Sequence, residues 1–478
     1  MALPGCRFIM AVLLSIGLAI IYGLKVNLSV AIVSMVNYTA VNLLQSEELQ
    51  FANEDFCSIQ AVNYTALETN QTDSVTFQDG PFNWSPNVQG IILSSYFWGY
   101  LAAMFPGSQI AEIISAKWVF FFAVLVNIIG TLATPISCYT HYTLVYVVRI
   151  AEGLGGGVTF PTTHVLLAHW APPNERSIMA SIAFSGTILG TVISNLLSGI
   201  IAIEAGWEWV FYIMGALSTI WLLLWVIFVT DKPRDLKFIG QKELDMIESS
   251  LGTSGDTKKR QRKVPWKKIL ESKPFWAILV AHTCSNWGFY MLLLNMPLFM
   301  KQVLKFTMAQ VSIYAAIPYF IMWLFSLAIG QTLDRLRQHK KITTTTARKI
   351  ATLIASAPVA ICLLILSFVS CQIVAAVILL TASLTAMGAM YSGFMTNHID
   401  IANNYAGTLM GMTNTIATIP GIVGPLFVGM LIDDDPSIKS WSIIFYVTIG
   451  FFIIEILVYT LFGKGDEQPW NKPEDDNE

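Results

Sequence analysis

The chain has 478 residues, of which 54% are apolar, 12% aromatic and only 12% charged, and its formal net charge is −3. Soluble domains carry about 25% charged residues, so this composition excludes an ordinary soluble enzyme. The small net charge disfavours nucleic acid as a partner. The six cysteines show no C-x-x-C spacing, which leaves a metal site or dithiol chemistry without support.

Twelve apolar runs are long enough to cross a bilayer, which takes roughly 20 helical residues. The first run, 8–35, is longer than the core of a signal peptide, so we expect it to remain as a spanning helix. The others follow at 87–107, 117–137, 142–165, 177–202, 208–230, 274–300, 310–332, 348–370, 372–398, 405–432 and 440–463. We therefore predict an all-α polytopic membrane protein.

Lysine and arginine are concentrated in cytoplasmic loops of membrane proteins, so their positions predict orientation. Segment 36–86 contains neither residue, whereas segment 231–273 contains twelve and segment 335–349 contains six. Both termini are therefore expected in the cytoplasm, and loop 36–86 on the luminal or extracellular side. Sequons for N-glycosylation fall in that loop at Asn37, Asn63 and Asn70.

The chain also repeats itself weakly. Gly186-Thr187-x-x-Gly190 recurs as Gly407-Thr408-x-x-Gly411, and Trp207-x-x-x-Phe211-Tyr212 recurs as Trp441-x-x-x-Phe445-Tyr446, both at an offset near half the chain length. This pattern predicts parallel repeats with a substrate site between them. The expected parts are a six-helix half at 1–230, a cytoplasmic linker at 231–273, a second six-helix half at 274–463 and a cytoplasmic tail at 464–478.

A few ionisable residues lie inside the apolar runs, where burial of a charge is costly and a partner or a cavity is expected. They are Lys25, Arg149, Glu152, His164, His282, His398 and Asp400. Each also has a structural interpretation. Lys25 could extend to an interface, Arg149 and Glu152 could form an ion pair at i and i+3, the histidines could be packing residues, and His398 and Asp400 could cap a helix end.

Two cations in the same half, Lys25 and Arg149, favour a site for an anion. Glu152 is then a candidate proton carrier beside Arg149. The glycines at 153, 155, 156 and 157 lack the lysine and Ser/Thr of a phosphate-binding loop, so we interpret them, like the pairs Gly186/Gly190 and Gly407/Gly411, as helix-packing positions. No catalytic spacing is present, and we expect neither an enzyme nor a cofactor.

Several stretches spread over almost the whole chain carry a resemblance to a known family. They are Tyr22-Gly-Leu-Lys-Val-Asn-Leu-Ser-Val30, Gly153-Leu-Gly-Gly-Gly-Val-Thr-Phe-Pro161, Trp170-Ala-Pro-Pro-Asn-Glu-Arg-Ser177, Trp287-x-Phe-Tyr290, Gly330-Gln-x-x-Asp334, Asn397-His-Ile-Asp-Ile-Ala402 and Thr413-Asn-Thr-x-Ala-Thr-Ile-Pro-Gly421. These stretches resemble the anion/cation symporter family of the major facilitator superfamily, the group of sialin, the vesicular glutamate transporters and the type I sodium/phosphate cotransporters, and are most like those of sialin.

The resemblance implies the major facilitator fold, with twelve transmembrane helices in two halves that rock to move an anion together with H⁺ or Na⁺. It maps the anion-facing cations of the family onto Lys25 and Arg149. The sequence departs from the family at Lys25, where arginine is usual, and at Gly156, where sialin and the glutamate transporters carry a glutamate. Ser285 stands where the glutamate transporters carry an arginine, which argues against vesicular glutamate transport.

We therefore predict a symporter for a small organic or inorganic anion, acting as a monomer in the plasma membrane or in a lysosomal or vesicular membrane. The expected substrate-binding residues are Lys25, Arg149, Tyr22, His164, Asn286 and Tyr290, and the expected coupling residues are Glu152, His398 and Asp400. A Na⁺-coupled phosphate cotransporter is the alternative within transport. A non-transporting nutrient receptor and an intramembrane enzyme are the alternatives from other classes.

Overall fold

The computed structural model describes residues 5–41, 79–172, 175–251, 264–369, 372–435 and 437–471. The first half of the chain forms α1 (Cys6–Met35), α3 (Pro86–Ile113), α4 (Ala116–Thr140), α5 (Tyr142–Trp170), α6 (Arg176–Glu204) and α7 (Trp207–Phe228). The second half forms α10 (Lys273–Gln302), α11 (Met308–Gln338), α12 (Thr344–Val369), α13 (Ile373–Met387), α14 (Phe394–Ile401), α15 (Ala406–Ala417), α16 (Ile419–Asp434) and α17 (Ile438–Phe462).

These helices confirm the predicted all-α fold with twelve spans. Ten segments of the described chain are both long and apolar enough to cross a membrane, and α3 and α5, with 28 and 29 residues, supply the other two. Most helices extend a few residues beyond the predicted apolar runs. The reason is that hydropathy detects only the lipid-facing length, whereas the hydrogen-bonded helix continues into the interface.

The sequence predicted spans ten and eleven as continuous helices, but in the structure each span is divided into two helices. The short 3₁₀ segment Gly388–Tyr391 separates α13 from α14. Thr418 separates α15 from α16, and Pro420 follows as the second residue of α16. Proline lacks the N–H that would continue the helix and clashes with the carbonyl four residues earlier, so the break is expected at this point.

The charged linker contains two further helices, α8 (Gln241–Leu251) and α9 (Trp266–Leu270). Helix α8 is fixed to the start of α1 through Glu243, which accepts hydrogen bonds from the backbone N–H groups of Cys6 (2.9 Å) and Arg7 (3.1 Å). A carboxylate at the unsatisfied N–H groups of a helix start is a favourable arrangement. The Arg7 guanidinium binds Glu243 (2.9 Å) and also Glu175 (2.6 Å).

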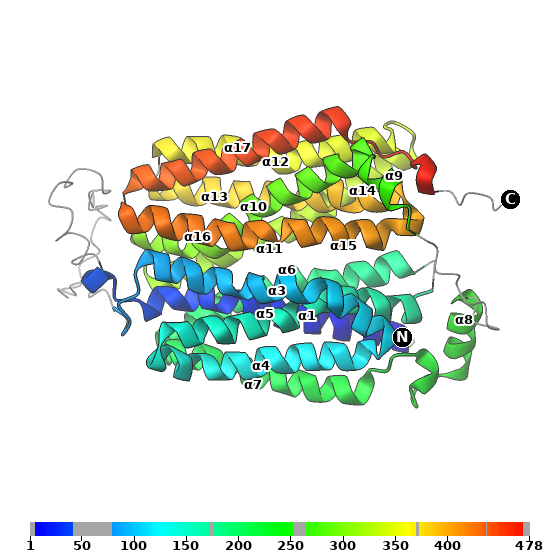
Figure 1. Cartoon of the computed structure of the whole chain (residues 1–478), viewed down its shortest axis with the longest axis horizontal. Helices are drawn as coiled ribbons and strands as arrows, with labels where there is room; N and C mark the ends of the chain where they lie inside the picture. The colour runs from blue at the N-terminus through cyan, green and yellow to red at the C-terminus, as the bar shows by residue number, and fades with distance from the viewer. Residues whose placement is uncertain are drawn as a thin grey trace, which may run out of the picture.

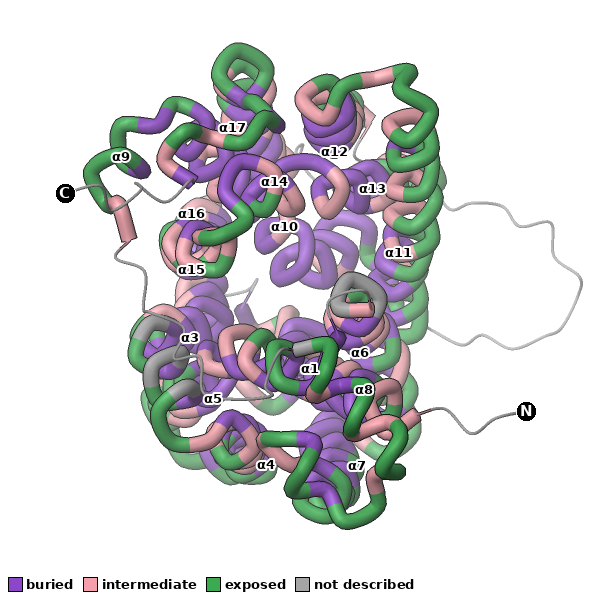
Figure 2. The backbone as a smooth tube through the Cα atoms, turned by 90° about the vertical axis from the view of Figure 1, so that its right-hand side faces the viewer, coloured by how far each residue is buried: buried purple, intermediate pink, exposed green. Residues whose placement is uncertain are grey.

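Figure 1 shows the helices of the two halves of the chain as two groups that lie side by side along one long axis. The start of α1, the end of α17, α8 and α9 lie at one end of the molecule, which we call the terminal end. Figure 2 views the molecule from that end and shows α1 and α3–α7 below α10–α17. The end that carries the loop after α1 is called the loop end.

The two halves are packed together at the loop end. Gly90 of α3 and Gly429 of α16 bring the two backbones so close that a Cβ on Gly429 would lie 3.2 Å from the Gly90 Cα. Asn195 of α6 donates from Nδ2 to the Ala315 carbonyl of α11 (3.3 Å). These contacts close the loop end of the interface between the halves.

The glycine patterns have two different outcomes. Gly186 and Gly190 lie against the carbonyls of Ser15 and Ala19, so they allow α6 to pack closely on α1, as predicted. The packing role predicted for Gly407 and Gly411 is wrong, because a Cβ added at either would meet nothing within 4 Å. They lie in α15, in the terminal-end portion of span eleven, where the described part of the other half does not pack against them.

Candidate functional site

Lys25 lies inside the protein, near the interface between the two halves. Its side chain is 2% exposed, so the interpretation that it extends to a membrane surface is wrong. Its ammonium nitrogen makes no hydrogen bond with any described residue. Instead it is surrounded by aromatic rings of α1, α3 and α10, whose centroids lie 4.4 to 5.7 Å from Nζ: Phe97, Tyr290, Tyr22, Tyr100 and Tyr96. We call these five rings and Lys25 the Lys25 cage.

Arg149 lies next to the Lys25 cage, but its donors are largely occupied. Its side chain is 2% exposed. One terminal nitrogen donates to the Leu24 carbonyl (3.2 Å) and to Glu152 (2.7 Å), and the other donates to the Lys25 carbonyl (2.8 Å). Its Nε, like Lys25 Nζ, makes no hydrogen bond with a described residue. Arg149 therefore joins α5 to the backbone of α1 through its two terminal nitrogens.

Glu152 is held by Arg149 and by a residue of α4. One carboxylate oxygen accepts from Arg149 and the other accepts from the Thr131 hydroxyl of α4 (3.0 Å). The side chain is 1% exposed and lies directly against Gly130 of α4. The predicted i, i+3 pair is thus present, and it is buried between α4 and α5.

Of the other expected substrate-binding residues, the structure brings Tyr22 and Tyr290 to Lys25 and leaves two elsewhere. Asn286 donates from Nδ2 to the Ala417 carbonyl (2.9 Å), which joins α10 to α15 near the break in span eleven. His164 is exposed and lies 4.9 Å from the Phe184 ring. Fifteen residues separate it from Arg149 on α5, a rise of about 22 Å toward the terminal end.

The two remaining candidates for ion coupling have separate surroundings. His398 Nε2 lies 2.8 Å from the Thr413 hydroxyl, which is also 3.1 Å from His282 Nδ1, and His398 Nδ1 donates to the Met395 carbonyl (2.9 Å). Asp400 forms an ion pair with Arg348 (2.6 Å). The position of Asp400 is therefore explained by a structural pair, whereas the histidines form a hydrogen-bonded group within the second half.

Gly156, the second departure from the family pattern, is in contact with the Lys25 cage. A Cβ built on Gly156 would collide with the hydroxyl of Tyr96, whose ring also lies 5.1 Å from the Arg149 guanidinium carbon. The space into which a larger side chain at position 156 would extend is occupied by Tyr96. The other glycines of the run pack as predicted, since Gly153 and Gly157 lie on the carbonyls of Tyr96 and Tyr100.

Sequence reasoning missed two parts of this interior. It did not select Tyr96, Phe97 and Tyr100, although three aromatic residues at i, i+1 and i+4 of one apolar run were a visible signal. It also missed Glu455, a fully buried carboxyl in α17, the only acidic residue between Lys439 and Lys464.

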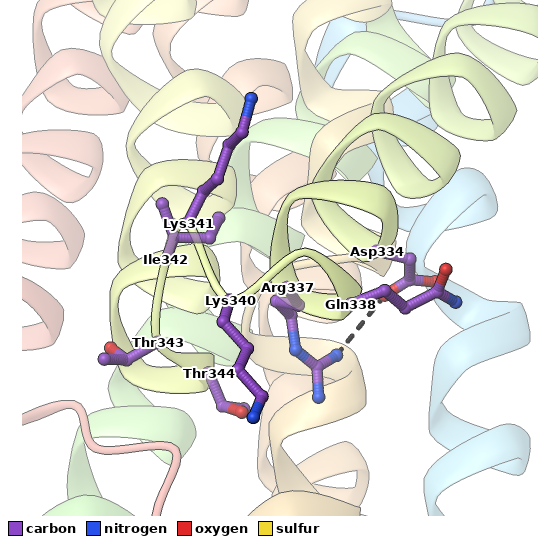
Figure 3. Close-up of a pocket in the computed structure, with 8 residues that line it drawn as sticks. All are labelled: Asp334, Arg337, Gln338, Lys340, Lys341, Ile342, Thr343 and Thr344. Atoms are coloured by element: carbon purple, nitrogen blue, oxygen red, sulfur yellow. Dashed lines mark hydrogen bonds and ion pairs between the residues drawn. The ribbon is translucent and has the colours of Figure 1, made fainter.

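Two surface pockets lie at the terminal end and are not lined by residues of the Lys25 cage. One, of about 710 Å³, is formed by the turn between α11 and α12 (Figure 3). Arg337 pairs with Asp334 (3.3 Å), and the exposed Lys340 lies in the same turn. This basic turn belongs to the cation-rich segment 335–349. It is therefore evidence for which end of the protein faces the cytoplasm, and it is not part of the Lys25 cage.

Comparisons with known proteins give a consistent family. The family described as Major Facilitator Superfamily matches residues 14–425. The chain is 39% identical to sialin of Homo sapiens over 98% of this chain and 92% of sialin. It is 34% identical to a "Putative inorganic phosphate cotransporter" of Drosophila melanogaster over 99% and 87% of the two chains, and 33% identical to vesicular glutamate transporter 2 of Homo sapiens over 99% and 76%.

Solved structures show the same fold at low identity. A bacterial homologue of the human lysosomal transporter Spinster, in an inward-facing and unoccupied conformation, superposes with a TM-score of 0.66 at 14% identity, covering 97% of this chain and 99% of the other. The D-xylose-proton symporter superposes with a TM-score of 0.65 at 14% identity, covering 96% and 98% of the two chains.

Proposed function

Because this chain belongs to the major facilitator superfamily, we propose that it is a secondary active symporter that carries a small anion across a membrane by alternating access. The relatives at 33% to 39% identity over nearly the whole chain support an anion as the substrate class. The positive-inside distribution supports the terminal end as the cytoplasmic end, with the halves closed at the loop end.

The observation that carries this proposal is the buried, unpaired ammonium of Lys25 among five aromatic rings. A buried charge without a partner is costly, and an anion is the partner that removes this cost. The rings attract the cation through their faces and exclude water, which strengthens its attraction for an anion. Lys25 is therefore the main anion-binding cation, and Arg149 fixes the backbone on which Lys25 stands.

We assign ion coupling to Glu152. Arg149 donates both to Glu152 and to the Leu24 and Lys25 carbonyls of α1. Protonation of Glu152 therefore weakens its ion pair with Arg149, and the guanidinium transmits this change through the two carbonyls to the position of Lys25. Protonation of a carboxylate next to a bound cation is a local electrostatic change that can select between two arrangements. This links a coupling proton to the Lys25 cage without direct contact between them.

The test is uptake into proteoliposomes that contain the purified protein, with a panel of carboxylates and inorganic phosphate under an imposed pH or Na⁺ gradient. The proposal predicts saturable uptake of at least one anion, driven by one of the gradients and abolished in Lys25→Ala. The match to an inorganic phosphate cotransporter favours a Na⁺-driven phosphate carrier as the second candidate. Phosphate uptake that follows Na⁺ and ignores the pH gradient selects it. A protein that binds anions but moves none is the outcome expected of a nutrient receptor.

A further inference from the structure

Glu455 of α17 is a carboxyl group buried inside the second half, and the symport proposed above gives it no role. It is 0% exposed, and neither of its oxygens makes a hydrogen bond with a described residue. Helix α17 packs on α12 and α10, and the groups that face the carboxyl from them are the Ser356 hydroxyl and the Cys284 thiol. Asp433, the acidic residue of α16 whose side chain is described, lies at the loop end of that helix.

No cation is paired with this carboxyl in the described part of the chain. The nearest basic residue on the Ser356 face of α12 is Arg348, eight residues before Ser356, which is a rise of about 12 Å. Arg348 is already bound to Asp400 through two nitrogens (2.6 and 3.4 Å) and to the Ser392 carbonyl (2.7 Å). An ionised carboxylate in this position would be uncompensated within the membrane, which the cost of burying a lone charge disfavours.

The hydrogen bond made by Ser356 points to the same conclusion. Its hydroxyl donates to the Thr352 carbonyl (2.9 Å), so in this arrangement it offers Glu455 only lone pairs. A carboxylate, which is an acceptor only, gains nothing from that neighbour. A carboxylic acid does, because its O–H can donate to the Ser356 oxygen.

Polar groups connect this position with the terminal end. Arg348, Thr352 and Ser356 are spaced by four along α12 and share one face, and Glu455 and Tyr459 are spaced by four along α17. Asn397 Nδ2 donates to the Tyr459 hydroxyl (2.9 Å), while Thr352 Oγ1 and Asn397 Oδ1 are buried without hydrogen-bond partners. Buried polar atoms without a partner are costly, so Thr352 Oγ1 and Asn397 Oδ1 favour a polar path along this row.

We propose that Glu455 is a proton-binding site in the second half of the transporter, occupied in this conformation, and that it exchanges its proton with the cytoplasm along Ser356, Thr352 and Tyr459. The exchanged species is the proton alone: the Glu455 O–H bond breaks as a bond to a hydroxyl or water oxygen forms. The inference extends the proposed symport by adding a proton site to that of Glu152, and it uses the proposed orientation.

Infrared difference spectroscopy of the purified protein in lipid tests the site without any transported anion. At neutral pH the wild type should show the carbonyl stretch of a protonated carboxylic acid, which Glu455→Gln removes. The exposed control Glu271→Gln should keep the band. Identical wild-type and Glu455→Gln spectra overturn the proposal. If Glu455→Gln does not fold, Ser356→Ala keeps the acid and should shift its band, and an unshifted band contradicts the assigned contact.

Proteoliposome uptake then tests the role of the site in coupling. Glu455→Gln should lose the part of anion uptake that depends on the pH gradient and keep anion exchange, whereas Glu271→Gln keeps both. Unchanged accumulation in Glu455→Gln overturns the coupling role. Absence of all anion uptake in the wild type, with the acid band intact, rejects the proposed anion symport and leaves the proton site standing.

Discussion

Replacement of Lys25 by methionine should separate anion binding from protein stability. The change keeps the length and apolar stem of the side chain and removes the charge that five rings surround. Truncation of one partner of a buried charge pair costs about 2 to 5 kcal/mol of binding free energy. At 1.4 kcal/mol per factor of ten, the anion affinity should fall by about thirty-fold to several thousand-fold.

The same variant should unfold at the wild-type temperature or above it. In the absence of anion the ammonium is buried without a hydrogen-bond partner, and exchange of an uncompensated charge for an apolar group is neutral or stabilising. The assay combines the concentration dependence of uptake in proteoliposomes with the thermal unfolding midpoint of the anion-free protein. Lys237→Met, at an exposed position of the linker, is the matched control. Wild-type uptake constants in Lys25→Met would refute the assignment of Lys25 to the anion.

Three further outcomes follow from the same contacts. Glu152→Gln should keep anion exchange but lose anion accumulation driven by a pH gradient, and normal accumulation would assign the coupling proton to another residue. The unfolding free energy of this variant should fall by about 1 to 3 kcal/mol, because the glutamine NH₂ group would face the Arg149 or Thr131 donor. Gly156→Glu should lower the thermal midpoint, since overpacking against Tyr96 costs about 1 to 3 kcal/mol; an unchanged midpoint would contradict the contact. The protection of α8 amides against hydrogen exchange, measured relative to the unprotected rate at the same pH, should be high at neutral pH and fall as pH falls below about 4.3. In Glu243→Gln this protection should be low at every pH.

The sign of the last effect follows from the surroundings of two carboxylates. Burial alone would raise the pKa of Glu243. Hydrogen bonds from the Arg7 and Cys6 N–H groups and from the Arg7 side chain outweigh this effect, so the pKa of Glu243 is below its ordinary value. The Arg7 guanidinium likewise lowers the pKa of Glu175. Because the pKa is lower in the folded state, ionised Glu243 stabilises the attachment of α8 at any pH above the ordinary pKa of a glutamate. This stabilisation is lost as the carboxylates take up protons in acid.

The twelve spans could be predicted from the sequence because each depends on local composition, namely an apolar run of bilayer length. The breaks in spans ten and eleven are less accessible, since proline and glycine inside membrane helices often cause only a kink. Helix α8 was hidden because its position depends on a contact between Glu243 and the start of α1, more than 230 residues away in sequence. No local pattern specifies such a pairing.

Only some residues of the candidate site could likewise be predicted from the sequence. Lys25, Arg149 and Glu152 were visible because a charge in an apolar run is rare, and the i, i+3 spacing predicted their pair. The aromatic rings were not, because aromatic residues in membrane helices usually pack against lipid or other helices. Only the folded arrangement shows that Phe97 of α3 and Tyr290 of α10 meet around Lys25.

Lys25 and Gly156, the two positions at which the sequence departs from the family pattern, both lie next to the Tyr96 side chain. The Tyr96 ring lies 5.7 Å from the Lys25 nitrogen and 5.1 Å from the Arg149 guanidinium carbon, and its hydroxyl lies where a side chain at position 156 would begin. Without a carboxylate at 156, the buried charges Lys25, Arg149 and Glu152 sum to +1 when all are ionised. A second carboxylate at this point would neutralise the cluster and compete with a bound anion for Lys25. Under the proposed symport, we therefore expect glycine at 156 to leave Lys25 free for the anion and proton coupling to depend on carboxyls outside the Lys25 cage.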